Sequence, residues 1–155
     1  MQDIYNLSSE ICALYEDILN AGLNLRVRVT GKSMVPFLKD EEVVTLRKVP
    51  ASSLRRGDLI FFRDRYGSLI LHRIIRKRKS GSKVYLETKG DALIAFDEPV
   101  RADDVLGKAC GVEKKVCGEK MIYRDLTSGF WRSINLLMAL VSLGRSKIYE
   151  TVLSR

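Results

Sequence analysis

The chain has 155 residues, a formal net charge of +8 and a hydrophobic fraction of 46% with only three prolines. These values exclude a disordered chain and predict a single domain that can bury a core without disulfides or metal ions. One histidine, and three cysteines without a Cys-x-x-Cys pair, argue against a zinc site. No metal or cofactor is therefore expected. The positive charge favours an anionic partner, which could be nucleic acid, an acidic peptide or a lipid surface.

An amphipathic helix is predicted at the N-terminal end. Its apolar residues recur at three- and four-residue steps, at Ile4, Leu7, Ile11, Leu14 and Ile18. Gly22 is the expected stop. Acidic residues interrupt this segment at Asp3, Glu10, Glu16 and Asp17. The segment therefore lacks the basic start and unbroken apolar stretch of a secretory signal peptide.

Short strands are predicted from Arg26 to Arg124. The apolar or alternating segments are residues 26–29, 42–49, 58–63, 68–75, 83–88, 105–112 and 120–124. Turn residues separate several of them, as at Gly57-Asp58, Tyr66-Gly67 and Ser80-Gly81. This pattern favours a mainly β fold, either an antiparallel sheet or a small barrel. The basic run at residues 76–79 is interpreted as a solvated hairpin loop.

The helical pattern returns at residues 130–153. Without a repeat or linker, we expect a single domain over residues 1–155, with an N-terminal helix (1–24), a β part (25–125) and a C-terminal helical segment (126–155). The longest apolar stretch, residues 134–143, is shorter than the roughly 20 residues of a membrane span. The expected location is the cytoplasm or the membrane periphery.

Two roles stay open for the C-terminal helix. Phe130 and Trp131 at one end, with Arg132, Arg145 and Lys147 as flanking cations, are typical of a helix lying on an anionic membrane surface. Alternatively, its apolar positions pack on the β core; these are Ile134, Leu137, Met138 and Val141.

The state of the cysteines is also left open. Cys110 and Cys117 could form a disulfide, but buried free thiols are the preferred interpretation.

Four residues could carry chemistry: Ser33, His72, Asp91 and Asp97. A serine, a histidine and an aspartate can together make an activated hydroxyl nucleophile, because the histidine takes the proton and the acid orients the histidine. Taken singly, each has an ordinary structural role. A serine and two aspartates in turns often bond their own backbone, and a lone strand histidine is often simply half-buried.

The order and neighbours of these residues resemble the type I signal peptidase superfamily, which includes self-cleaving repressor domains. Residues 31–36 read Gly-Lys-Ser-Met-Val-Pro and match its nucleophile box. Residues 57–62 match a Gly-Asp box followed by apolar residues, residues 89–91 match a Lys-Gly-Asp box, and residues 105–108 match a closing Val-x-Gly-x strand. The resemblance covers residues 29–112 and implies an antiparallel β domain of the same kind.

His72 followed by Arg73 is similar to the histidine branch of that superfamily, found in endoplasmic-reticulum, archaeal and sporulation-type enzymes. The resemblance implies a serine endopeptidase in which Ser33 is the nucleophile and His72 the base. Asp97 lies where the branch carries its third member, and Asp91 is the alternative. Gly31 and Met34 are expected to shape the site around the oxyanion. Members of this branch normally have an N-terminal membrane anchor, where this chain has a charged amphipathic helix.

The implied substrate is an extended peptide or preprotein with small residues on the acyl side of the cut, bound by strand addition. A cytosolic protease that matures leader peptides is one alternative use of the fold. A self-cleaving regulator is another, with Ala21-Gly22, Cys110-Gly111 or Cys117-Gly118 as the cleaved bond. A non-enzymatic module that binds RNA or an acidic peptide through residues 76–79 is a third, although nucleic acid is not favoured.

Overall fold

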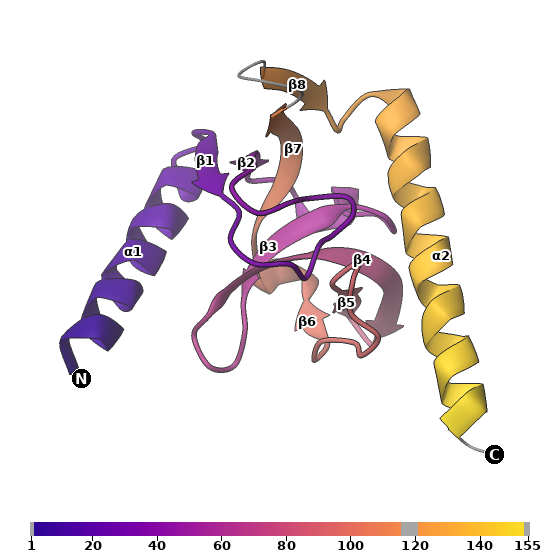
Figure 1. Cartoon of the computed structure of the whole chain (residues 1–155). Helices are drawn as coiled ribbons and strands as arrows, with labels where there is room; N and C mark the ends of the chain where they lie inside the picture. Colours follow the sequence, from indigo (N-terminus) through magenta and orange to yellow (C-terminus); the bar gives the residue numbers. More distant parts are fainter. Residues whose placement is uncertain (1, 116–120, 154–155) are drawn as a thin grey trace.

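In a computed structural model, which describes residues 2–115 and 121–153, two helices flank a strongly bent antiparallel sheet (Figure 1). The helices are α1 (Gln2–Asn20) and α2 (Gly129–Leu153). The strands in this part of the chain are β1 (Leu25–Arg28), β2 (Val43–Arg47), β3 (Leu59–Arg63), β4 (Leu69–Ser80), β5 (Lys83–Lys89), β6 (Val100–Arg101), β7 (Val105–Lys115) and β8 (Met121–Asp125). Single 3-10 turns cover Ala51–Ser53 and Ala102–Asp104. The mainly β prediction with a helix at each end is confirmed.

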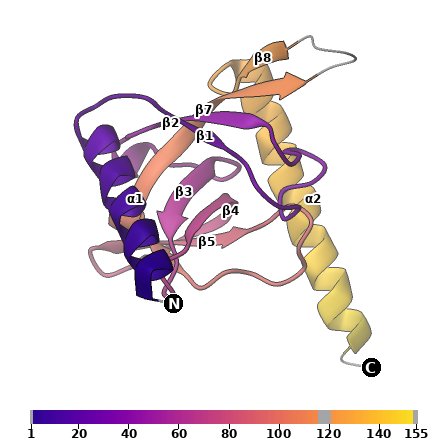
Figure 2. The same ribbon diagram turned by 60° about the vertical axis from the view of Figure 1, so that its left-hand side comes forward.

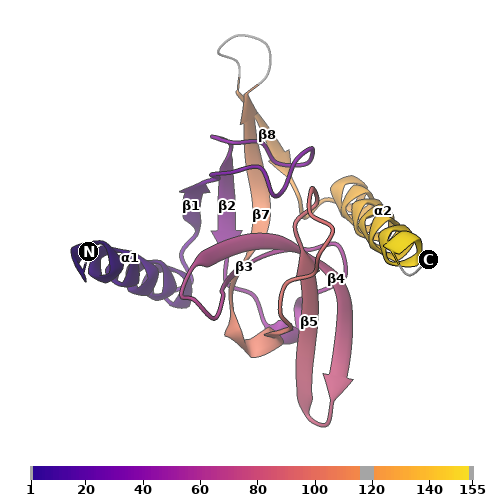
Figure 3. The ribbon, with the colours of Figure 1, turned by 60° about the horizontal axis from the view of Figure 1, so that its bottom comes forward.

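The strands follow the order β1-β2-β7-β3-β4-β5-β6, and β8 also pairs with β7. The long strand β7 changes partners along its length, from β3 near Val105 to β2 in the middle and β8 at its far end. The register shifts between Thr45 and Leu46 and between Phe61 and Phe62. Such irregularities increase the local twist of the strands. The sheet is strongly curved, as Figure 3 shows.

Strand β3 separates two apolar cores. Leu59 and Phe61 contribute to a larger core that includes Leu19 of α1, and Ile60 and Phe62 contribute to a smaller one. Successive side chains of a strand point to opposite faces, so each face of β3 is buried against a different cluster. This explains why residues 59–62 form an unbroken apolar run where a half-exposed strand would alternate.

Helix α2 packs on the sheet with both apolar and polar residues. Of the four apolar positions considered for core packing, Ile134 and Met138 pack against the larger core. Leu137 and Val141 are exposed instead. Packing on the core therefore accounts for only part of the apolar surface of this helix. Within the described residues, no helix is long and apolar enough to cross a bilayer.

The interpretation of residues 76–79 as a hairpin loop is wrong. Strand β4 continues through them to Ser80, and they pair with β5. Arg76 and Arg78 both reach Glu87 on β5, and these cross-strand ion pairs help hold an exposed basic segment in the sheet. The two-residue strand β6 was not predicted, because it is too short to show a pattern. Cys12 and Cys110 are free thiols; Cys117 lies outside the described residues.

Candidate active site

His72 lies on β4 opposite Ile60 of β3 and is buried. Its Nδ1 is 2.8 Å from Oδ2 of Asp97, which belongs to the loop between β5 and β6. Thr88, at the end of β5, donates its hydroxyl to the same Oδ2 at 2.7 Å. The backbone N–H of Asp97 donates in turn to the Thr88 carbonyl at 2.9 Å. The carboxylate is thus held in one place and directed at the imidazole.

This contact indicates which of the two ring nitrogens of His72 carries the hydrogen. When Nδ1 carries a hydrogen and donates it to Asp97, Nε2 of the neutral imidazole has a free lone pair. Nε2 faces the start of the same loop at Gly90: a Cβ placed on Gly90 would lie 3.0 Å from Nε2 and 2.7 Å from the carbonyl oxygen of Ser33. The absence of a side chain at Gly90 therefore lets the histidine and the serine segment approach each other.

Ser33 lies in the connection between β1 and β2, and three contacts hold this segment. The Ser33 carbonyl accepts the Ala92 N–H at 2.8 Å, which ties it to the loop that carries Asp97. Met34 is buried in the larger core. Gly31, with φ of 93° in the left-handed region, donates its N–H to Asp40 at 2.9 Å. Within the described residues, neither the Ser33 hydroxyl nor its backbone N–H has a hydrogen-bond partner.

Ser33 and His72 line the same cleft, of about 420 Å³. Its other walls are mainly apolar and come from α1, β1, β3 and β4, with Tyr15, Val27, Phe61, Leu69 and Leu71 among them. The ring of Tyr15 rests against Phe61 at 6.3 Å between centroids, so α1 forms one wall of the cleft. The helix stands beside the sheet on the side away from α2 (Figure 2). A serine and a histidine that share an apolar cleft can act on a bound peptide.

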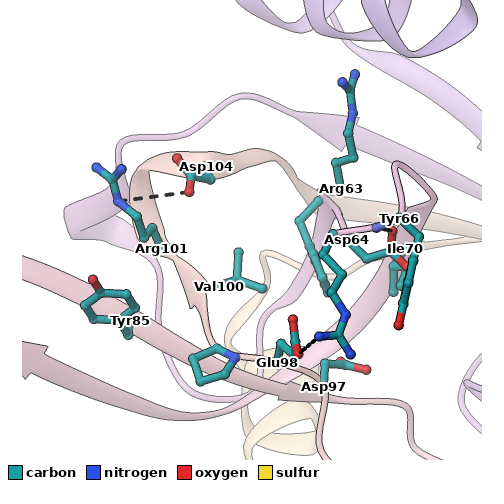
Figure 4. A pocket seen from close by; sticks show the side chains of 13 residues that line it. Arg63, Asp64, Tyr66, Ile70, Tyr85, Asp97, Glu98, Val100, Arg101 and Asp104 are labelled. Atoms are coloured by element: carbon teal, nitrogen blue, oxygen red, sulfur yellow. Dashed lines mark hydrogen bonds and ion pairs between the residues drawn. The ribbon is translucent and has the colours of Figure 1, made fainter. Parts of the chain in front are cut away.

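A second pocket, of about 460 Å³, adjoins the first at Ile70, which lines both. Figure 4 shows Asp97 in its wall beside Glu98. Glu98 forms an ion pair with Arg65, whose Nη1 lies 2.6 Å from the Glu98 carboxylate. Charged side chains of both signs surround the rest of this pocket (Figure 4). The apolar cleft at Ser33 and the charged pocket at Asp97 thus offer two different surfaces on either side of Ile70.

Asp91 has a different partner. Both of its carboxylate oxygens accept from Arg73, each at 2.7 Å, and both side chains are buried. Arg73 also donates to the Gly57 carbonyl at 2.9 Å and to Asn135 of α2 at 2.8 Å. Because His72 and Arg73 are neighbours on one strand, their side chains point to opposite faces of the sheet. The two aspartates are therefore separated by β4, and the structure brings Ser33, His72 and Asp97 together without Asp91.

Sequence reasoning missed Thr88, Gly90 and Lys89, although the stretch that holds them was recognised. Lys89 is fully buried and donates to the Ser142 carbonyl at 2.7 Å and to the Ser146 hydroxyl at 2.6 Å. Burial lowers the pKa of Lys89; Arg145 lowers it further and Asp91 opposes the shift. The lysine of the Lys-Gly-Asp box thus binds α2, and the glycine makes room for Ser33 and His72.

Comparison of the chain with protein-family models, with curated proteins and with solved structures found no match.

Proposed function

We propose that this protein is a serine endopeptidase that resembles signal peptidase I and cleaves signal or leader peptides with Ser33, His72 and Asp97. The observation that carries this proposal is the 2.8 Å contact of His72 Nδ1 with Asp97 at a cleft that Ser33 also lines. An imidazole oriented by an aspartate, at a cleft that a serine also lines, supplies the groups that nucleophilic catalysis uses, and substrate binding has to bring Ser33 Oγ within hydrogen-bond reach of Nε2. The side chains come from three separate segments of the chain.

In the first half of the reaction, Ser33 Oγ attacks the scissile carbonyl carbon while Nε2 of His72 takes the hydroxyl proton. Asp97 stabilises the resulting imidazolium through Nδ1–H. The tetrahedral intermediate collapses when the C–N bond breaks and the imidazolium gives its proton to the leaving amine. Water, deprotonated by the same imidazole, then hydrolyses the acyl-serine and regenerates the free hydroxyl.

The oxyanion requires hydrogen-bond donors aimed at the place where negative charge develops. The backbone N–H of Ser33 lies next to the nucleophile and has no acceptor within the described residues. The residue two before Ser33 is Gly31, so no side-chain hydroxyl is available at that position. We therefore assign the Ser33 N–H as one donor, with any second donor coming from the backbone.

The proposed substrate is an extended peptide with small residues before the cut, as the family resemblance implies. Strand β1 borders the cleft through Val27 and Arg28, and it pairs only with β2 within the described residues. Its other edge can accept the backbone of an extended substrate as a further strand. Small side chains then suit the apolar cleft, which Tyr15 and Phe61 narrow.

Self-cleavage, and binding of RNA or an acidic peptide, fit the described contacts less well. The Cys110-Gly111 bond lies inside β7 and would have to leave the sheet to be cut, because Gly111 pairs with both β2 and β8. The Ala21-Gly22 bond follows α1, and Cys117-Gly118 lies outside the described residues. For the RNA or acidic-peptide module, Glu87 already neutralises part of the basic run through Arg76 and Arg78.

The test is cleavage of a library of fluorogenic peptides, combined with labelling by a fluorophosphonate that reacts with activated serines. Ser33→Ala should abolish both signals and leave the melting temperature nearly unchanged, because the hydroxyl makes no contact that stabilises the fold. Ser68→Ala, a change at another serine of the described chain that lies in the exposed turn before β4, is the matched control. Labelling and cleavage that persist in Ser33→Ala would overturn the proposal.

A further inference from the structure

Helix α2 presents polar groups to the protein core. Asn135, Ser142 and Ser146 are buried, and they contact two buried cations. Asn135 Oδ1 accepts from Arg73 at 2.8 Å, and the Ser142 carbonyl and Ser146 hydroxyl accept from Lys89 at 2.7 and 2.6 Å. A buried cation without such acceptors would be strongly destabilising. The inner face of α2 therefore supplies acceptors to these two charges, alongside the contacts of Ile134 and Met138 with the larger core.

The outer face of α2 carries most of the helix's large apolar side chains. Leu137 is 59% exposed and Ile148 is 68% exposed. Further exposed apolar residues at helical spacing complete one stripe: Phe130, Leu136, Leu140 and Val141. Figures 1 and 3 show that α2 lies along the side of the sheet opposite α1. The exposure of the stripe residues places this face of α2 toward solvent. A contiguous exposed apolar stripe of this kind marks a surface that binds a partner.

Unpaired arginines lie beside this stripe. Two neighbouring clefts, of about 430 and 220 Å³, share Arg55 and Arg132, and Arg56 and Arg47 line one each. Within the described residues, none of the four guanidinium groups forms an ion pair. The backbone N–H of Arg55 donates to Asp58 at 2.8 Å, and the pKa of Asp125 is lowered by hydrogen bonds from Thr127 and, to a smaller extent, by Arg47. Asp58 also lines the larger cleft, but it is paired with Lys108 at 2.8 Å.

The two surfaces adjoin, because Leu136 of the apolar stripe also lines the larger arginine cleft. A second copy of the chain, at a formal charge of +8, would bring more positive charge toward these arginines. An anionic bilayer complements both surfaces at once, since acyl chains accept the apolar stripe and lipid phosphates accept the guanidinium groups.

We propose that α2 docks this protein on an anionic membrane, with the helix parallel to the surface, Leu137, Leu140 and Val141 at the acyl boundary, and Arg55 and Arg132 on lipid phosphates. This proposal is independent of the peptidase activity. The inner face of α2 also touches the loop of Asp97, since Ser146 donates to the Ile94 carbonyl at 2.8 Å and Arg145 to the Asp91 carbonyl at 3.2 Å. Docking would therefore hold the cleft at a constant orientation to the membrane.

Point variants test this better than truncation, because deleting α2 would remove both hydrogen-bond acceptors of Lys89 and the Asn135 acceptor of Arg73. Co-sedimentation would use vesicles of phosphatidylcholine with about 30% phosphatidylglycerol, and pure phosphatidylcholine for comparison. The full chain should bind the anionic vesicles and lose binding at high salt. Leu137→Glu should weaken binding about tenfold or more, since a charge replaces a leucine that docking would bury at the acyl boundary. Leu14→Glu, at a leucine of α1 that is 55% exposed, adds the same charge on the opposite side and should bind as the unchanged chain does.

A second set of variants removes one positive charge and leaves the apolar stripe unchanged. Arg132→Gln should weaken binding to anionic vesicles about fivefold, as expected for one cation near such a surface. Lys83→Gln, at the exposed first residue of β5, removes the same charge elsewhere and should have a smaller effect. Circular dichroism and melting temperature confirm that each variant is folded. The proposal is overturned if anionic vesicles do not bind the chain, or if Leu137→Glu binds no more weakly than Leu14→Glu. It is equally overturned if sedimentation velocity finds a dimer that Leu137→Glu dissociates, without vesicle binding.

Discussion

Thr88 and Asp97 hold each other through two hydrogen bonds, one from the Thr88 hydroxyl to Asp97 Oδ2 at 2.7 Å and one from the Asp97 N–H to the Thr88 carbonyl at 2.9 Å. The same Oδ2 is the atom that contacts His72. Thr88 is fully buried at the end of β5, so its hydrogen bonds fix the carboxylate of Asp97, a loop residue, relative to the sheet. In the proposed mechanism it is a positioning residue, since it acts through Asp97.

Removing that hydroxyl should slow the reaction more than it weakens the fold. Thr88→Val keeps the size of the side chain, but it deprives a charged acceptor of a hydrogen bond that contributes about 1.5–3 kcal/mol. We expect kcat to fall at least about tenfold while KM changes little, and Thr88→Ser to restore most of the rate. Steady-state kinetics on a cognate peptide measure both constants. A fall in stability with unchanged kcat would mean that Thr88 has only a structural role.

The same Asp→Asn substitution should have different effects at Asp97 and at Asp91. Asp97→Asn can hold His72 in the wrong tautomer, and such a change lowers kcat by roughly a thousandfold or more in comparable sites. Asp91→Asn instead leaves Arg73 buried without its counter-charge, which should reduce the free energy of unfolding by about 3–5 kcal/mol. Urea denaturation and peptide cleavage, run on both variants, resolve the two effects. A folded Asp91→Asn that loses more rate than Asp97→Asn would contradict this assignment.

Gly90 should tolerate no side chain. A Cβ there would lie 2.7 Å from the backbone oxygen of Ser33 and 3.0 Å from His72 Nε2, and a backbone atom cannot move aside easily. Gly90→Ala should lower stability by about 1–3 kcal/mol and activity at least about tenfold. Gly129→Ala is the matched control, because no atom lies within 4 Å of a Cβ at that position. Melting temperatures and cleavage rates of the two variants check the prediction.

Lys89 should make the free energy of unfolding depend on pH in the alkaline range. Its pKa in the folded protein lies below the ordinary lysine value of 10.5, so between these two values the unfolded chain binds more protons than the folded one. The contribution of Lys89 to stability therefore rises with pH in that window, by at most about 1.4 kcal/mol per pH unit. Urea denaturation at intervals from about pH 7 up to 10.5 should show the unchanged chain gaining stability relative to Lys89→Met as the pH approaches the upper end of that range. A constant difference between the two proteins would contradict the lowered pKa.

Local patterns in the sequence were enough to predict most of the elements. The repeat of Ile11, Leu14 and Ile18 predicted α1, and the apolar run at residues 59–62 predicted β3, because helix and strand periodicities are properties of neighbouring residues. The same patterns predicted too short a β4, since cross-strand pairs with Glu87 hold its basic end in the sheet. The short strand β6 depends entirely on its partner β5.

The sequence by itself determined the candidate residues Ser33 and His72, because the motif around the serine is local and the chain has a single histidine. It left Asp91 and Asp97 as alternatives, and only the tertiary structure separated them. Neighbouring strand residues face opposite sides, so what each aspartate meets depends on how β4, β5 and α2 pack together. The orientation of α2 was decided in the same way. Its polar residues turn inward because Arg73 and Lys89 are buried there, and no pattern within the helix reveals those distant charges.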